Sequence, residues 1–146
     1  MLTLDKTRRF LEKTAEELNF AKEIDRNEMY KLLIDASRDL EPFPEEKKLE
    51  ENFVKGCTSN VYIAAEEKGG LITYYGSSEA LIVRGYVAIL VKALSGLSPD
   101  DVLDTEDLIR DFVETTDVKA SLTPSRANAF GNIYALMRKK AEELKN

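Results

Sequence analysis

Residues 61–76 of this chain read VYIAAEEKGGLITYYG, and this stretch decides the class of the fold. Apolar side chains recur at alternate positions in residues 61–65 and again in residues 71–75, which is the period of a β-strand. Between the two runs, Gly69 and Gly70 supply the backbone freedom that a tight turn needs. The sequence therefore predicts an antiparallel hairpin.

A short apolar run precedes the hairpin, and a turn separates the two. We expect residues 52–54 to form a third strand beside the hairpin. Cys57 would then lie at the tip of the loop that joins this strand to the hairpin. Gly56 and the polar residues after Cys57 are typical of a turn whose central side chain is accessible.

Helical periodicity accounts for most of the remaining chain. Helices are expected at residues 4–19, from Asp25 to about residue 40, at residues 80–94, from Ser98 onward and from Thr123 onward. The helix at 80–94 carries apolar side chains on almost every side, so we expect it to be the central element of the core. Gly85 within this helix costs about 1 kcal/mol relative to alanine, which indicates that a neighbouring element approaches closely.

Polar residues at the starts of these helices are expected to cap them. Asp25 and Glu28 together have the form of a capping box. Ser77 or Ser78 can cap the central helix. Thr123 is followed by a proline, and this combination is a strong start signal for the last helix.

These elements predict an α+β fold in which a small antiparallel three-stranded sheet is packed with helices. The chain has 146 residues, with no internal repeat and no linker of biased composition. This length suits one domain with an ordinary core. We therefore expect a single domain over residues 1–146.

Charge and hydropathy narrow the classes of partner. Lysine and arginine number 21 against 27 aspartates and glutamates, for a net charge of −6, and the basic residues are scattered. Nucleic acid is not an expected partner, because phosphate binding needs concentrated positive charge. The most apolar stretch, residues 80–94, contains Arg84 and Lys92 and is shorter than the roughly twenty residues of a membrane span. The first residues show no signal sequence, so we expect a cytoplasmic protein with no membrane partner.

Cys57 is the only cysteine, and the chain contains no histidine. One thiol cannot close an internal disulfide, and no Cys/His dyad or His-containing metal cluster can form, so no metal site is expected. A lone cysteine is commonly a small buried hydrophobe, but the polar turn around Cys57 favours an accessible thiol. If Cys57 reacts, its partner sulfur comes from another molecule. A single cysteine also fits a reducing compartment.

Three cations can be considered as activators of this thiol: Lys55, Arg84 and Arg126. Arg126 lies in the first turn of the predicted last helix, where the helix dipole disfavours positive charge. It is therefore either paired with a carboxylate or positioned for an anion such as a thiolate or persulfide. Arg84, within an apolar helix, must form an ion pair or reach the surface.

Three motifs occur in order along the chain: GCTSNVY at residues 56–62, GSSEALIVRGY at residues 76–86 and LTPSR at residues 122–126. Together they resemble the SufE family, whose members accept sulfur from cysteine desulfurases. The resemblance runs from about residue 28 to the C-terminus. The chain departs from the family pattern at Tyr62, Glu79 and Ala129, where the family usually has tryptophan, aspartate and glycine.

The resemblance implies a fold akin to iron–sulfur scaffold proteins of the IscU type, and it implies an activity. A PLP-dependent cysteine desulfurase of the SufS or CsdA type forms a persulfide, and Cys57 takes over the outer sulfur. The chain would stimulate the desulfurase and deliver sulfur to an iron–sulfur scaffold complex of the SufBCD type. It would thus act as a trans-persulfidase only together with its partner. The PLP belongs to that partner, so no cofactor is expected on this chain.

The resemblance also implies roles for particular residues. Cys57 would carry the persulfide, and Arg126 would stabilise the thiolate or persulfide. The residues expected to contact the partner are Gly56, Thr58, Ser59, Glu79 and Arg84. Two alternatives stay open, namely a docking module that activates a desulfurase without carrying sulfur and a thiol redox sensor. Because small thiols readily remove persulfide sulfur, we expect Cys57 to be partly sheltered before docking.

Overall fold

The computed structural model describes the chain except residues 1, 58, 117, 119–128 and 146. Its helices and strands, in chain order, are α1 (Leu4–Ile24), α2 (Arg26–Ser37), the 3₁₀ helices η1 (Glu45–Lys47) and η2 (Glu50–Asn52), β1 (Val61–Lys68), β2 (Leu71–Ser78), α3 (Leu81–Leu94), α4 (Pro99–Leu103), α5 (Glu106–Thr115) and α6 (Ala129–Leu144). A hairpin accompanied by helices confirms the expected α+β class.

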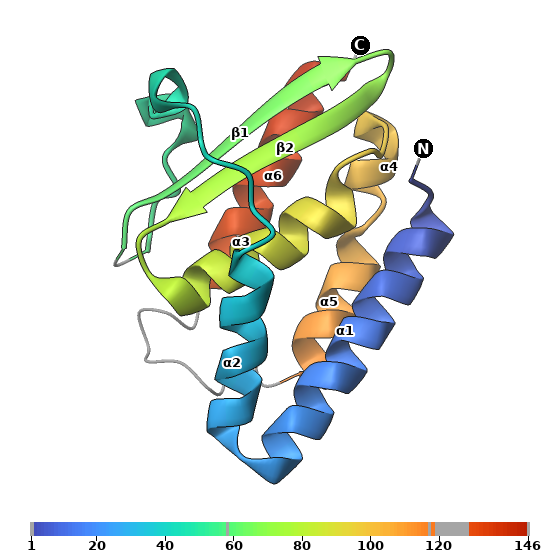
Figure 1. Cartoon of the computed structure of the whole chain (residues 1–146). Helices are drawn as coiled ribbons and strands as arrows, with labels where there is room; N and C mark the ends of the chain where they lie inside the picture. Colours follow the sequence, from blue (N-terminus) through green and yellow to red (C-terminus); the bar gives the residue numbers. More distant parts are fainter. Residues whose placement is uncertain (1, 58, 117, 119–128, 146) are drawn as a thin grey trace.

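The hairpin of β1 and β2 lies across α3 and α6, and the long helices α1 and α2 extend away from it (Figure 1). β2 packs on α3, and β1 packs on α6. α2 lies against α3, while α1 packs against α2 and α5. α3 is therefore covered by strands and helices together, and its buried residues are Val83, Gly85, Tyr86, Val87, Ala88, Ile89, Leu90, Ala93 and Leu94.

The predicted hairpin is confirmed, and its strands are longer than expected. β1 and β2 pair antiparallel along their whole length, from Val61 opposite Ser78 to the turn, and both turn glycines take positive φ angles. On β2, Tyr74 is buried and donates its hydroxyl hydrogen to the carbonyl oxygen of Met137 in α6 at 2.8 Å. This bond fixes the hairpin against the last helix.

The expected third strand is wrong, because residues 52–54 do not form one. η2 occupies the start of this segment, and Phe53 makes only a single bridge to Tyr62. Val54 donates its amide hydrogen to the carbonyl oxygen of Val61 at 2.8 Å, after which the chain turns away. Over the residues that the structure describes, the sheet therefore has two strands.

α1 and α2 form consecutive helices that meet at Asp25. α1 runs to Ile24, beyond its expected end, because its buried stripe continues through Ala21. The expected start of α2 is confirmed, since the Asp25 carboxylate accepts a hydrogen bond from the amide of Asn27 at 2.8 Å. The capping box is not formed with Glu28, because the Asp25 amide already donates to the carbonyl oxygen of Ala21 at 3.0 Å. None of the described helices is long and apolar enough to cross a membrane.

The expected serine cap on α3 is wrong. Ala80 occupies the N-cap position, because Ser77 and Ser78 belong to β2. The Ser78 hydroxyl oxygen, two positions before the N-cap, does accept a hydrogen bond from the amide of Ala80 itself, at 3.2 Å. Ser98 caps α4 as expected of a helix start. The start predicted at Thr123 lies outside the described residues.

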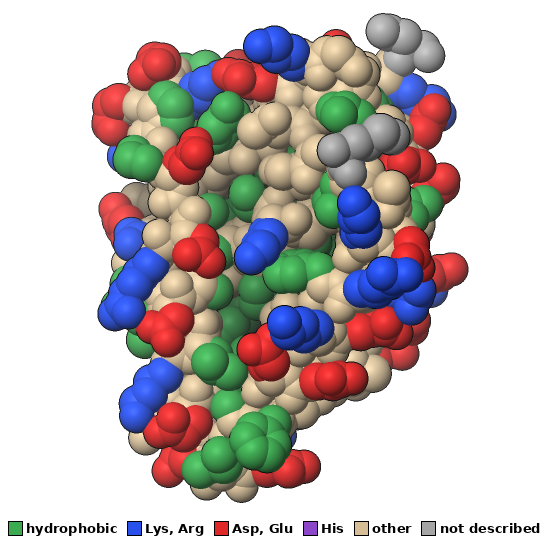
Figure 2. Space-filling view, turned by 45° about the vertical axis from the view of Figure 1, so that its right-hand side comes forward, with side chains coloured by type: hydrophobic (Ala, Val, Ile, Leu, Met, Phe, Trp, Pro, Cys, Tyr) green, Lys and Arg blue, Asp and Glu red, His purple; other side chains and the backbone are tan. Residues whose placement is uncertain are grey.

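A hollow of about 240 Å³ lies between α1 and α2, with α3 beneath it. Figure 2 shows a hollow with hydrophobic side chains on its floor and charged side chains along its rims. Lys92 of α3 reaches over Phe10 of α1, with its ammonium nitrogen 5.4 Å from the ring centre. This cation–π contact covers apolar surface without burying the charge.

Replacement of Gly85 by alanine is predicted to destabilise the fold. A Cβ atom at Gly85 would clash with the carbonyl oxygen of Leu33 in α2, which is backbone and cannot yield without moving a helix. We expect a loss of about 1–3 kcal/mol in the free energy of unfolding, measured by urea denaturation. Gly131→Ala is the matched control, because no atom of the described residues lies within 4 Å of the Cβ position there. That variant should gain about 0.5–1 kcal/mol, and equal effects of the two changes would contradict the close approach.

Candidate functional site

The loop that carries Cys57 is held at both of its ends. The hydrogen bond between Val54 and Val61 closes its base at 2.8 Å. Beside that bond, the ring of Tyr62 packs against Phe53 and Phe43, with ring centres 5.5 and 6.1 Å apart. A loop anchored in this way presents its tip at a defined place relative to the hairpin. Tyr62, one of the departures from the family pattern, thus supports the loop through its ring.

Cys57 itself is half-buried and packs against the edge of the core. Burial raises the pKa of the Cys57 thiol above its ordinary value, and a hydrogen bond from the Asn132 side chain offsets part of that rise in pKa. Among the described residues, the net effect favours the protonated thiol of Cys57 over the thiolate. The partial shelter expected from the sequence is confirmed.

Asn132 is the residue of this site that sequence reasoning missed. It lies in the described first turn of α6 and reaches the loop at Gly56. A Cβ atom at Gly56 would stand 2.7 Å from Asn132 Nδ2, and the φ angle of Gly56 is +88°. Glycine suits this backbone conformation, and any larger residue here would push the Asn132 side chain aside. The sequence signal was weak, because one amide on the predicted last helix gives no indication of which loop it meets.

A hollow of about 520 Å³ opens beside Asn132. Its walls come from η2 and the turn before Cys57 on one side and from α6 on the other, and they consist of Glu50, Glu51, Phe53, Lys55, Asn132, Ala135, Leu136 and Lys139. Lysines and glutamates both line it, so the hollow has no single sign of charge. Lys55 is exposed on this wall, two positions before the cysteine in the chain.

A buried lysine ties the approach to the loop onto α6. Lys140 donates hydrogen bonds to the side-chain oxygen of Asn52 and, at 3.4 Å, to the carbonyl oxygen of Glu51. Burial lowers the pKa of Lys140 from its ordinary value. These bonds satisfy a charge that would otherwise be costly inside the protein, and they hold η2 in place ahead of Cys57.

Four other residues were expected from the sequence to belong to the site, and the structure describes two of them. The Ser59 hydroxyl oxygen is buried and has no hydrogen-bond partner among the described residues. Glu79 is exposed between β2 and α3. Thr58 and Arg126 lie outside the described residues. The roles expected of these four side chains stay predictions.

Arg84 extends from α3 toward the end of β2. Its Nε donates a hydrogen bond to the carbonyl oxygen of Ser78 at 2.8 Å, and the side chain is half-buried. It lines a polar hollow of about 290 Å³ together with Lys48 and Glu41. In the described part of the chain Arg84 forms no ion pair, and its hydrogen-bond partner there is the Ser78 carbonyl oxygen. It is not among the groups that shift the pKa of Cys57.

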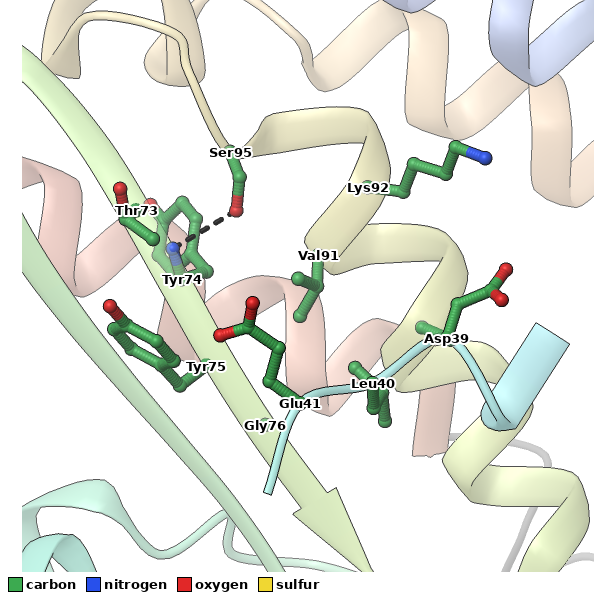
Figure 3. A pocket seen from close by; sticks show the side chains of 11 residues that line it. Asp39, Leu40, Glu41, Thr73, Tyr74, Tyr75, Gly76, Val91, Lys92 and Ser95 are labelled. Atoms are coloured by element: carbon green, nitrogen blue, oxygen red, sulfur yellow. Dashed lines mark hydrogen bonds between the residues drawn. The ribbon is translucent and has the colours of Figure 1, made fainter. Parts of the chain in front are cut away.

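Another hollow, of about 550 Å³, lies between β2, α3 and residues 39–41 (Figure 3). One of its walls is fixed where the amide of Tyr74 donates to the hydroxyl oxygen of Ser95 at 3.0 Å. Cys57 is not among its lining residues, so this hollow is separate from the thiol. Across the described residues, no group of three or more acidic or cysteine side chains is arranged to hold a metal ion.

The chain matches a known protein family and resembles proteins of two organisms. The family model of SufE, described as an Fe-S metabolism associated domain, matches residues 12–141. The chain is 43% identical over 122 residues to a SufE-like protein of Synechocystis sp., a match that covers 84% of this chain and 75% of that protein. It is 35% identical over 118 residues to SufE-like protein 1, chloroplastic/mitochondrial, of Arabidopsis thaliana, covering 79% of this chain and 30% of that protein.

A solved structure shares the fold. The solution structure of a hypothetical protein from Thermus thermophilus superposes with a TM-score of 0.68 at 20% sequence identity. The match covers 90% of this chain and 94% of that one. At this identity the likeness concerns the arrangement of helices and strands.

The half-buried thiol is predicted to react slowly with a bulky reagent. A maleimide that carries a large fluorophore should label folded Cys57 at least about tenfold more slowly than the same chain unfolded in urea, because burial restricts access and raises the thiol pKa. The chain has one cysteine, so the mass of the product reports on this site alone. Equal rates in the folded and unfolded chain would show that Cys57 is not sheltered.

Proposed function

Because this chain belongs to the SufE family, we propose that it is a sulfur carrier that takes persulfide sulfur from a PLP-dependent cysteine desulfurase onto Cys57. It stimulates that desulfurase and delivers the sulfur to an iron–sulfur cluster assembly scaffold. The observation that carries the proposal is the setting of Cys57. The only thiol of the chain sits at the tip of an anchored loop, half-buried and within hydrogen-bond contact of a side chain from α6.

The proposed step exchanges one sulfur–sulfur bond for another. The Cys57 thiolate attacks the outer sulfur of the persulfide on the desulfurase cysteine. A new bond forms between the Cys57 sulfur and the outer sulfur. The bond between the outer sulfur and the desulfurase cysteine breaks, and that cysteine leaves as a thiolate. The hydrogen on the outer sulfur stays there, and no external oxidant or reductant is consumed. One cysteine on the carrier is sufficient for this reaction.

The raised pKa of Cys57 gives the free carrier a resting state. A protonated, half-buried thiol reacts slowly with stray electrophiles, and a persulfide formed there is less open to small thiols. Docking of the desulfurase would then give its persulfide access to the thiol. Arg126 of this chain is proposed to stabilise the negative charge that develops on the sulfur.

The surface that binds the desulfurase is proposed to surround the open end of the hairpin, beside the Cys57 loop and opposite the Gly69–Gly70 turn. Val61 pairs with Ser78, so the start of β1 after Cys57 lies beside the end of β2. Glu79 follows directly, and Arg84 is bonded to Ser78. With Gly56, Thr58 and Ser59 on the loop, these residues are the proposed contacts for the desulfurase. A scaffold of the SufBCD type is the proposed recipient of the sulfur.

The compartment and the cofactor belong to the same proposal. PLP is proposed to act on the desulfurase, with none bound by this chain. The cytoplasmic location expected from the sequence stays a prediction, because the name of the Arabidopsis relative places that protein in chloroplasts and mitochondria.

Sulfur transfer predicts a persulfide on Cys57. After incubation with a cysteine desulfurase and cysteine, intact-mass spectrometry should show one added sulfur atom that dithiothreitol removes. Cys57→Ser should acquire none and should lose the stimulation of desulfurase turnover. If Cys57→Ser still stimulates turnover, the chain is a docking module and the transfer proposal fails. If the chain forms disulfide-linked dimers in peroxide but gains no sulfur from the desulfurase and cysteine, it is a redox sensor.

Arg126→Ala is predicted to slow sulfur acceptance more than it lowers stability. Loss of a cation that stabilises the thiolate should reduce the single-turnover rate of persulfide formation by about tenfold, with little change in the urea midpoint. Arg110→Ala is the matched control, because Arg110 forms exposed ion pairs on α5. A parallel collapse of rate and stability in Arg126→Ala would indicate a structural ion pair instead.

A further inference from the structure

Asn132 meets the Cys57 loop with a defined atom. From the Cβ position at Gly56, Asn132 Nδ2 is 2.7 Å away, whereas its Oδ1 is 3.9 Å away. The amide nitrogen therefore faces the loop and the amide oxygen is turned from it. An amide nitrogen only donates hydrogen bonds, and a thiolate or persulfide anion only accepts them. The same side chain hydrogen-bonds Cys57, the next residue, so a donor nitrogen at this point of the loop matches an anionic sulfur.

We propose that Asn132 is a further catalytic residue of sulfur acceptance, whose side-chain amide donates a hydrogen bond to the Cys57 sulfur and stabilises it as the attacking thiolate. This inference rests on the proposed function of Cys57 and names the group on the chain's own α6 that prepares it. It concerns a residue that lies outside the three motifs by which the chain resembles its family.

The surroundings of Cys57 make this bond important. Among the described residues, burial and Asn132 are the two influences that shift the pKa of the thiol, and they act in opposite directions. No described cation takes part. Charged acceptors form stronger hydrogen bonds than neutral ones, so the bond strengthens when the thiol loses its proton. The extra stabilisation from the Asn132 hydrogen bond is thus specific to the thiolate, which is the form that reacts.

The backbone around Gly56 is arranged to permit the contact. A side chain at this position would displace the amide of Asn132, and a positive φ angle is favourable there for glycine. Asn132 also lines the 520 Å³ hollow beside the loop, so one side chain borders both the thiol and an open space. A persulfide that enters from this hollow would meet the same amide as it reaches Cys57.

The test compares Asn132→Ala and Asn132→Asp with the wild-type chain. The pH at which alkylation of Cys57 by iodoacetamide is half-maximal should rise by about one unit in Asn132→Ala, because a hydrogen bond to a charged group is worth about that much. Asn132→Asp keeps the shape but replaces the donor with a negative charge, so its midpoint should rise further. Asn60→Ala is the matched control, since Asn60 is exposed on the same loop.

Sulfur acceptance supplies the second readout. Single-turnover transfer from a persulfidated desulfurase at pH 7 should slow by about tenfold in Asn132→Ala, in step with the smaller thiolate fraction. Unchanged alkylation midpoints in both variants would overturn the proposal, and a fall in the urea midpoint without a shift in the pH profile would assign Asn132 a structural role. If wild-type Cys57 receives no sulfur at all, the proposed function fails, whereas the alkylation profile still tests Asn132 by itself.

Discussion

The structure depends on the need to cover α3. Nine of its fourteen residues are buried, so most of the helix surface must be covered, and β2, α2 and α6 cover it together. The approach of α2 is close enough to require Gly85, and the hairpin is bound to α6 by the bond from Tyr74 to Met137. Once these neighbours are in place, the first turn of α6 lies beside the loop that follows η2. The position of Asn132 at Cys57 is thus a consequence of how the core is filled.

The site balances shelter against reactivity. Burial protects the thiol and disfavours the thiolate, while the amide of Asn132 favours the thiolate and costs no buried charge. A lysine or arginine in the same place would activate the thiol more strongly in the free protein, but it would also leave the free thiolate open to side reactions. A neutral hydrogen-bond donor in this place keeps the thiolate scarce until the desulfurase docks. The anchored loop base and the Lys140 bonds to η2 keep this geometry in place.

Local signals were sufficient wherever a short stretch of chain determines its own conformation. The hairpin followed from alternation and two glycines, and the starts of α2 and α4 followed from Asp25 and Ser98. Local signals failed where two segments compete for the same groups. η2 takes up Asn52, so the pairing with β1 stops at the single Phe53–Tyr62 bridge and no third strand forms. The amide of Asp25 is already used by α1, and Ser78 belongs to β2 instead of capping α3. In each case a neighbouring helix or strand had already taken up the residue that the pattern had assigned.

By itself the sequence determined the chemistry that is available: one thiol, no histidine, a polar turn around Cys57, and three motifs that mark the family. It also determined that a hairpin would be packed with helices. Only the tertiary structure decided how deeply the thiol is buried, that Asn132 and not Arg84 contacts the loop, and that Gly56 is needed to admit that contact. The reason is physical. A residue's type and its local periodicity are carried by its neighbours in the chain, whereas desolvation and hydrogen bonding depend on atoms that folding brings from distant segments.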